Sequence, residues 1–315
     1  MSKIFDALQG GGSEAADVMS ALLDNGAPQP KPAPQPKAVP QPAEAQAKIV
    51  VPPLPPAEPP QAWRPRVVSL AVPASAPLLP FEKAGMPAAE QYRIARTKIT
   101  HHPKRPKVIV VTSPSVGDGK SISAINLAAA LGLQSEIKVL LIDGDFRRSS
   151  IHPLLGLAAV PGLAEVISGE QPFEDVVVQA EQYPNLHILV SGSSTINPAE
   201  LLDSQRWRAL CDRLRERYQY VIIDSPPISM VADFELIQLA ADGTILVMRP
   251  DHTKRNPALK ALETVPREKL VGVLLNCVGH WILYKHEGYG YGYAKAYATQ
   301  AASKVERENG DRPQR

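Results

Sequence analysis

The stretch VVTSPSVGDGKSIS, residues 110–123, decides the fold. An apolar run of strand length leads into a glycine-containing loop, and a helical pattern begins near Ser121. Gly117 and Gly119 let backbone N–H groups turn toward phosphate oxygens, and the start of the helix adds the positive end of its dipole. Lys120 can reach the β- and γ-phosphates of a nucleotide, and the Ser121 hydroxyl can bind Mg²⁺. The general pattern GxxxxGK[ST] has glycine where this chain has Pro114, so the loop alone also fits a glycine-rich turn.

Two acidic sites follow other buried strand patterns. KVLLIDGDFRR, residues 138–148, places Asp143, Asp145 and Arg147 at the end of one strand, and YVIIDSPP, residues 220–227, places Asp224 at the end of another. Ligands of an open parallel sheet bind outside the carboxyl ends of its strands. Each aspartate alone could begin a turn or cap a helix. Together with the loop, they indicate a site for a nucleotide with its Mg²⁺.

Apolar runs of strand length alternate with helical patterns from about residue 88 onward. The expected strands cover residues 107–112, 138–142, 186–190, 220–223, 244–248 and 270–275, and the expected helices lie around residues 121–133, 204–217, 231–240 and 258–264. The strands are β-branched and do not alternate in polarity, as in a parallel sheet buried on both faces. We therefore expect one α/β domain over residues 88–283, with a mostly parallel sheet, helices on both faces and the P-loop NTPase architecture.

The rest of the chain divides into three parts. Residues 28–87 hold 18 of the 32 prolines, and we expect them to form a disordered, polyproline-rich linker. Residues 1–27 carry two short amphipathic patterns, which fit either a docking segment or a frayed terminus. Residues 284–315 are expected to be a flexible, tyrosine-rich tail.

Composition excludes several classes of protein. The net charge of +2 gives no electrostatic footprint for nucleic acid. No run of 18 apolar residues would span a membrane, and the first residues lack the pattern of a secretory signal. Two cysteines cannot build a disulfide framework, so we expect a cytoplasmic protein.

The three motifs together resemble those of a known family. TSPSVGDGKS at residues 112–121, LLIDGDFRR at 140–148 and VIIDSPP at 221–227 are similar to the Walker A, A′ and B motifs of the bacterial tyrosine kinases of capsule and exopolysaccharide systems. Val116 replaces the family's proline and Asp118 its glutamate. The resemblance implies an ATP-dependent protein-tyrosine kinase that uses Mg²⁺.

The resemblance also implies a set of site residues. The catalytic residues would be Lys120, Asp143, Asp145 and Arg147, with Asp143 as the base. The nucleotide-binding residues would be Gly117, Asp118, Gly119, Lys120, Ser121, Ile122 and Asn276. Mg²⁺ would be held by Ser121, Asp143 and Asp224.

Two further segments are similar to functional segments of the family. Glu90, Arg93 and Arg96 in EQYRIAR match a motif at the subunit interface of ring-forming members, and they share one helix face. That face could instead be solvated, with an internal Glu90–Arg93 pair. The tail tyrosines would accept phosphate, or would form an adhesive low-complexity segment. They are Tyr284, Tyr289, Tyr291, Tyr293 and Tyr297.

The partners are implied by the same resemblance. They are a membrane-anchored chain-length regulator that activates the kinase, a protein-tyrosine phosphatase, and further copies of the chain in a ring. The protein would then work at the inner face of the cell membrane through its partner. One alternative is a positioning ATPase of the ParA or MinD type, although such proteins usually carry a lysine where this chain has Ser115. Another alternative is a nucleotide-binding scaffold without kinase activity.

Overall fold

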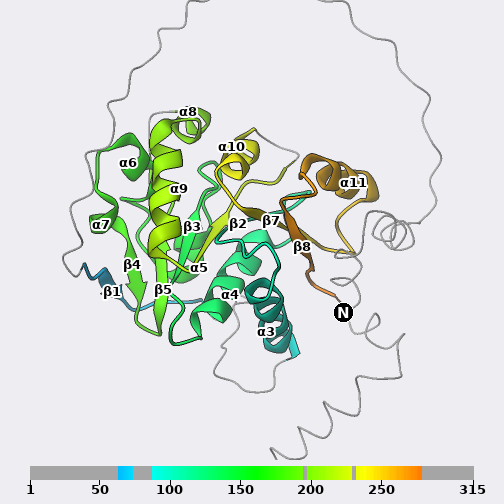
Figure 1. Ribbon diagram of the computed structural model, residues 1–315, viewed down its shortest axis with the longest axis horizontal. Helices are drawn as coiled ribbons and strands as arrows, with labels where there is room; N and C mark the ends of the chain where they lie inside the picture. The colour runs from blue at the N-terminus through cyan, green and yellow to red at the C-terminus, as the bar shows by residue number, and fades with distance from the viewer. Residues whose placement is uncertain (1–62, 74–86, 194–196, 229–231, 279–315) are drawn as a thin grey trace, which may run out of the picture.

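The computed structural model describes residues 63–73, 87–193, 197–228 and 232–278. Its centre is a sheet of eight strands in the order β1-β4-β5-β3-β6-β2-β7-β8 (Figure 1). Six strands are mutually parallel: β2 (Val108–Thr112), β3 (Val139–Asp143), β5 (Tyr183–Leu189), β6 (Tyr220–Asp224), β7 (Gly243–Met248) and β8 (Leu270–Leu275). These correspond to the six expected strands, so the prediction of a mostly parallel sheet is confirmed.

Helices cover both faces of the sheet. One face carries α3 (Pro87–Thr100), α4 (Lys120–Gly132) and α5 (Ile151–Leu155). The other carries α6 (Leu163–Ser168), α7 (Phe173–Val176), α8 (Pro198–Leu202), α9 (Gln205–Arg217), α10 (Asp233–Leu239) and α11 (Arg255–Thr264). Figure 1 shows α3 and α4 below the sheet and α8, α10 and α11 above it, while α9 runs down alongside the strands. The four expected helices correspond to α4, α9, α10 and α11.

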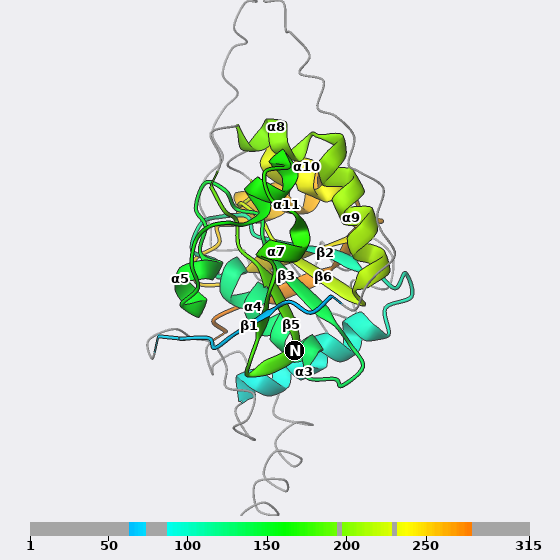
Figure 2. The ribbon, with the colours of Figure 1, turned by 90° about the vertical axis from the view of Figure 1, so that its left-hand side faces the viewer.

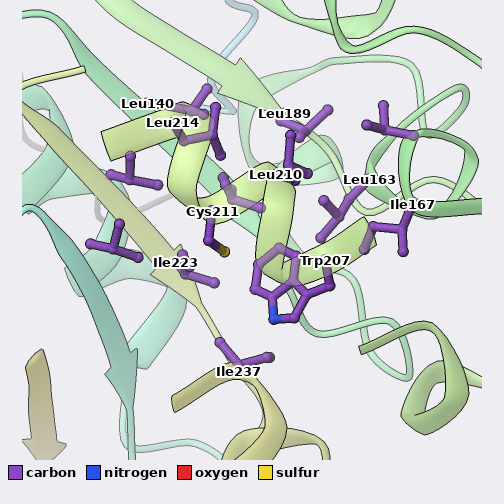
Figure 3. Packing of buried hydrophobic residues seen from close by; sticks show 14 of the residues in the cluster. Leu140, Leu163, Ile167, Leu189, Trp207, Leu210, Cys211, Leu214, Ile223 and Ile237 are labelled. Atoms are coloured by element: carbon purple, nitrogen blue, oxygen red, sulfur yellow. The ribbon is translucent and has the colours of Figure 1, made fainter. Parts of the chain in front are cut away.

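Successive residues of the central strands point into different helical layers. In β2, Ile109 and Val111 pack with α4, whereas Val108 and Val110 face the layer of α9 and α10. All of these strand side chains are buried, which explains the continuous apolar runs in the sequence. Trp207 of α9 is fully buried in this layer, in one cluster with Leu163 of α6 and Ile237 of α10 (Figure 3).

Two short strands at one edge of the sheet were not expected. β4 (Val178–Ala180) pairs antiparallel to β5, and β1 (Arg66–Val68) pairs parallel to β4. The structure therefore differs from the linker prediction over residues 63–73, which are placed against the sheet although they lie in the proline-rich stretch. The other expected linker residues, the N-terminal amphipathic patterns and the tyrosine-rich tail lie outside the described residues.

Candidate active site

The loop between β2 and α4 has the backbone of a phosphate-binding turn. Gly117 and Gly119 adopt φ of 91° and 90°, in the left-handed region that favours glycine. Helix α4 begins directly after Gly119, so the free N–H groups of its first turn open at the end of the loop. Among the described residues, positive φ outside glycine is confined to Arg105 and Cys277. Pro114 therefore needs no glycine-like conformation, and its departure from the general pattern causes no strain.

Lys120 brings the three motifs together. Its Nζ atom lies 3.0 Å from Asp145 Oδ2 and 3.5 Å from both carboxylate oxygens of Asp224. The Ser121 hydroxyl is 3.2 Å from the same nitrogen. Asp143 and Asp224 face each other in register on the adjacent strands β3 and β6. The expectation that these strand ends meet at one edge of the sheet agrees with this arrangement.

The carboxylates of this site are buried, and burial governs their protonation. The pKa of Asp224 is raised to about 7, mainly by burial and also by the neighbouring Asp143 charge, while Lys120 opposes the shift. Burial also raises the pKa of Asp143 above its ordinary value, against the effect of its hydrogen bonds. For Lys120, burial lowers the pKa, but the Asp224 and Asp145 charges outweigh it, so the pKa is raised and the ammonium persists. The site thus concentrates negative charge around one cation.

Asp143 is fixed by the start of α5. Its Oδ2 atom accepts hydrogen bonds from the Ser149 hydroxyl at 2.8 Å and from the backbone N–H groups of Ser150 and Ile151 at 3.1 and 3.0 Å. Its Oδ1 atom accepts from the Asp145 N–H at 3.2 Å. Because Oδ2 has three donors and Oδ1 has one, Oδ1 has the greater capacity to accept a proton or to bind a cation.

The Asp118 side chain has protein partners rather than an open position. It is fully buried, and Oδ1 accepts from the Thr253 hydroxyl at 2.7 Å and from His252 Nδ1 at 2.9 Å. Its Oδ2 atom accepts from the Ser115 N–H at 2.9 Å. Asp118 therefore ties the phosphate loop to the segment between β7 and α11, and any contact with a nucleotide falls to its backbone.

Asn276 lies directly against the phosphate loop. Its Nδ2 atom donates to the Asp118 carbonyl at 3.0 Å, and its backbone N–H donates to the Met248 carbonyl at 2.8 Å. A Cβ added at Gly119 would lie 2.0 Å from Asn276 Nδ2, so a larger residue would displace the Asn276 side chain in addition to the strain at this positive φ. Ile122 follows in the first turn of α4 and is partly buried.

Arg147 is held by a partner that the sequence did not indicate. Its Nε and Nη2 atoms donate to the Asp233 carboxylate at 2.8 and 3.2 Å, while 48% of the Arg147 side chain stays exposed. Asp233 is buried at the start of α10. This two-point contact connects the Walker A′ segment to α10 and fixes the direction of the guanidinium.

The α3 residues make contacts within their own chain. Arg93 Nη1 lies 3.0 Å from Glu90 Oε2, which is the internal pair that the solvated-face alternative expects. Arg96 Nη1 donates to the Ala130 carbonyl of α4 at 3.3 Å. The subunit-interface role of these residues stays a prediction. The five tail tyrosines lie outside the described residues.

The donors at the strand ends fit Mg²⁺ in its usual nucleotide-bound form. A hydroxyl and carboxylates are hard oxygen ligands, and Mg²⁺ commonly takes one or two of them together with phosphate oxygens and water. Within the described part of the chain, no group of three or more His, Cys, Asp or Glu side chains forms a ready-made metal cage. Ser121 and Asp224 fit this mode best, because Asp143 Oδ2 already has three protein donors.

Several functional contacts could not be found by reading motifs. His252, Thr253, Asp233 and Ser149 are single polar residues in loops or at helix starts, outside the three motifs. Thr253 and His252 contact Asp118 across 135 and 134 residues of sequence. A single sequence has no spacing rule for pairs so far apart, so only the fold reveals them.

Among the described residues, no helix has the length and apolar character needed to cross a membrane.

Comparison with known proteins places these features in context. The family model for an AAA domain matches residues 106–265. The tyrosine-protein kinase YwqD of Bacillus subtilis (strain 168) is 38% identical over 207 residues, which cover 64% of this chain and 85% of that relative. The tyrosine-protein kinase CpsD of Streptococcus agalactiae is 33% identical over 192 residues, which cover 60% of this chain and 83% of CpsD.

Two solved structures are also similar to this chain in sequence and fold. The chimerical protein CapA2B2 has 30% identity and a TM-score of 0.61, covering 68% of this chain and 95% of that chain. The VpsO kinase domain has 33% identity and a TM-score of 0.55, covering 61% of this chain and 95% of that chain. The residues matched by the family model include β2, β3 and β6, which carry the phosphate loop and the acidic strand ends.

Proposed function

The chain belongs to the bacterial tyrosine kinase family, and we propose that the site at the ends of β2, β3 and β6 transfers the γ-phosphoryl group of ATP to tyrosine hydroxyls. The observation that carries the proposal is the position of Lys120. Its ammonium lies at the end of the phosphate loop and contacts both Asp145 and Asp224. A cation at the end of the phosphate loop, beside oriented carboxylates, suits phosphoryl transfer, because catalysis is mostly positioning and charge stabilisation.

Each residue has a role that follows from its contacts. The backbone N–H groups from Gly117 to Ser121 bind the phosphates, and Lys120 stays in contact with the γ-phosphoryl group during the transfer. Asp143 accepts the phenol proton at Oδ1, while its Oδ2 is held by α5. A phenol has a pKa near 10, so the base that takes its proton must be close and oriented. Burial raises the pKa of Asp143 toward that of the phenol, which makes Asp143 a stronger base. Arg147, whose guanidinium is oriented by Asp233, would stabilise the transferring charge or position the acceptor.

We assign the Mg²⁺ of the nucleotide to Ser121 and Asp224, with Asp145 in support. The ion, when bound, would neutralise charge on the phosphates. Lys120, which contacts Asp224 in this structure, would move toward the phosphates as the carboxylate takes up the ion. The raised pKa of Asp224 makes its binding of a cation dependent on pH, with stronger binding at higher pH.

The proposed acceptors are the tail tyrosines of a neighbouring copy. Five tyrosines lie within 14 residues, interspersed with glycine, alanine and the longer side chains of Lys, His and Glu; they are Tyr284, Tyr289, Tyr291, Tyr293 and Tyr297. Each phosphate adds roughly −1.5 to −2 charges near neutral pH. Repulsion between phosphorylated tails and the acidic site would release them, which provides a cycle of assembly and disassembly.

The direct test is a reaction with Mg·ATP followed by mass spectrometry of the C-terminal peptide. Wild type is compared with Lys120→Met and with Lys260→Met, a matched lysine on the exposed side of α11. We expect phosphotyrosine in wild type and Lys260→Met, and none in Lys120→Met. Phosphotyrosine in Lys120→Met refutes the assignment. ATP hydrolysis without modified tyrosines favours a positioning ATPase, and nucleotide binding without either reaction favours a scaffold.

We further propose that the kinase acts in polysaccharide synthesis or export, at the inner face of the cell membrane, with a membrane-anchored activator and an opposing tyrosine phosphatase. One structural relative is a chimera, CapA2B2, which supports the idea of a second component. The ring would use Glu90, Arg93 and Arg96, and the proline-rich residues before the catalytic domain would serve as a tether. Arg93→Ala with Arg96→Ala should reduce the mass in solution; an unchanged oligomer contradicts this interface.

A further inference from the structure

The segment of residues 63–73 lies against the edge of the catalytic domain at three points. Figure 2 shows it in blue, crossing the sheet edge that faces the viewer, with α7 above it and α5 to one side. It is joined to α3 through residues 74–86, so its position is set by its own contacts rather than by a short connection. Those contacts begin at Trp63, continue through β1 and end at Ala71.

Trp63 anchors the first end of the segment. Its Nε1–H donates to the Glu174 carbonyl at 2.9 Å, and the Arg217 guanidinium lies 3.7 Å from the centre of its ring. Arg217 is held in turn by the Glu174 carboxylate at 2.8 Å. The indole also contacts the rings of Phe173 and His187, with centroids 6.1 and 5.9 Å away. An aromatic ring with a hydrogen bond and a stacked cation is the kind of anchor that dominates interface energies.

The middle of the segment adds a strand to the sheet. Arg66 to Val68 pair with Val178 to Ala180, and the Glu181 N–H donates to the Val68 carbonyl at 2.8 Å. Val68 and Leu70 pack on the apolar layer that also contains Leu155 of α5. This is recognition by strand addition, in which the backbone gives affinity and alternate side chains give register.

The far end of the segment reaches the helix that holds the proposed base. The Ala71 N–H donates to the Leu155 carbonyl at 3.1 Å, and Ala71 lies over Gly156, where an added Cβ would be 2.7 Å away. Leu155 is the last residue of α5, a helix of five residues. At its other end, the Ile151 N–H donates to Asp143 Oδ2. The five residues of α5, a little under one and a half helical turns, therefore separate the docked segment from the Asp143 carboxylate.

We propose that residues 63–73 are a docking strand that positions α5, and through it Asp143, for phosphoryl transfer. The inference rests on the proposed role of Asp143 as the base. Among the residues described, this strand is the part of the proline-rich region that contacts the catalytic domain. A force or a binding partner that acts on the proline-rich region would therefore affect Asp143 through the strand and α5. The phosphate loop has separate supports in Thr253 and Asn276, so nucleotide binding should stay largely independent of the strand.

The test uses the full chain and breaks each end of the strand separately. Trp63→Ala removes the anchor, and Trp63→Phe keeps an aromatic ring without the donor. Ala71→Pro removes the N–H that binds Leu155. Arg64→Ala, at an exposed neighbour in the same segment, is the matched control. The readouts are hydrogen exchange of residues 143–156, kcat for tyrosine phosphorylation, and Kd for the nucleotide.

We expect Trp63→Ala and Ala71→Pro to raise exchange at Ser150 and Ile151 by roughly tenfold, because their bonds to Asp143 open more often. The value of kcat should fall by roughly tenfold and the nucleotide Kd should change by less than about twofold. Trp63→Phe should recover part of kcat, and Arg64→Ala should match wild type.

The proposal is overturned if exchange at residues 150–156 stays at the wild-type rate in both variants, or if it rises while kcat does not change. Wild-type protein without kinase activity would instead refute the proposed function. Exchange would still decide whether the strand and α5 are coupled, so the two failures are distinguishable.

Discussion

Replacing Asp118 by alanine tests how the phosphate loop is held. The carboxylate is fully buried and receives three hydrogen bonds, from Thr253, His252 and the Ser115 N–H. Asp118→Ala leaves these donors without an acceptor. His252 can turn to water, because 43% of its side chain is exposed, but Thr253 is 5% exposed and cannot. The loss should therefore come mainly from Thr253 and from Ser115.

The magnitude follows from these two donors. An unsatisfied buried donor costs about 1–3 kcal/mol, so the buried Thr253 hydroxyl and the partly buried Ser115 N–H together predict a loss of roughly 3 kcal/mol in the free energy of unfolding. For a folded domain of this size, each kcal/mol lowers Tm by about 2–4 °C, which gives a decrease of roughly 6–12 °C. Asp118→Asn keeps one acceptor oxygen and should fall between alanine and wild type.

Thermal melting of the nucleotide-free protein measures this effect, and calorimetric titration measures nucleotide binding. We expect the nucleotide Kd of Asp118→Ala to rise by at least about tenfold, because the loop no longer holds its backbone N–H groups in one arrangement. Asp251→Ala is the control, since it breaks an exposed pair with Arg249 on the same segment and should lower Tm very little. If Asp118→Ala melts no earlier than Asp251→Ala, the proposed support of the loop is refuted.

Three further predictions concern other parts of the site and the core. Gly119→Ala combines a φ of 90° with a 2.0 Å approach to Asn276, so titration calorimetry should show a nucleotide Kd at least about tenfold higher; wild-type affinity would contradict this. Burial raises the pKa of Asp224 to about 7, so the folded state keeps a proton that the unfolded state releases, and stability falls as pH rises between about 4 and 7. Asp224→Asn should remove that loss, and its Tm relative to wild type should increase over the same range. Burial lowers the pKa of His187 to about 4, so the unfolded state binds the extra proton and stability falls as pH drops from about 6.5 to about 4. His187→Gln should reduce this decrease of Tm with falling pH, and an unchanged decrease would contradict the prediction.

The sequence predicted the central strands because each is buried on both faces. A strand with one layer of helices on either side needs apolar residues along its length, and such runs are visible at residues 108–111, 139–142 and 220–223. It also predicted that Lys120, Asp145 and Asp224 meet, because parallel strands end at a common edge. Those predictions needed no knowledge of the order of strands in the sheet.

The edge of the sheet was missed for the opposite reason. β1 and β4 have three residues each, and β1 has two exposed positions, so neither forms a recognisable apolar run. Proline-rich sequence on both sides of β1 favours an extended chain, and an extended chain is also what strand addition requires. Whether such a chain docks depends on the contacts of Trp63 with Glu174 of α7 and Arg217 of α9. The sequence around Trp63 does not indicate these distant partners.

The two halves of the active site have different supports, and this separates binding from chemistry. The phosphate loop is tied through Asp118 and Asn276 to the β7 and β8 side of the sheet. The proposed base, Asp143, is tied through α5 to the β4 edge, where residues 63–73 dock. A change at Thr253 should therefore act first on nucleotide affinity, and a change at Trp63 first on turnover. A double variant should then show effects on Kd and kcat that add, because Thr253 bonds to Asp118 whereas Trp63 contacts Glu174 and Arg217 at the opposite edge of the sheet. Strong coupling between the two changes would mean that the sheet transmits strain from one edge to the other. Nucleotide affinity and turnover would then not depend on separate supports.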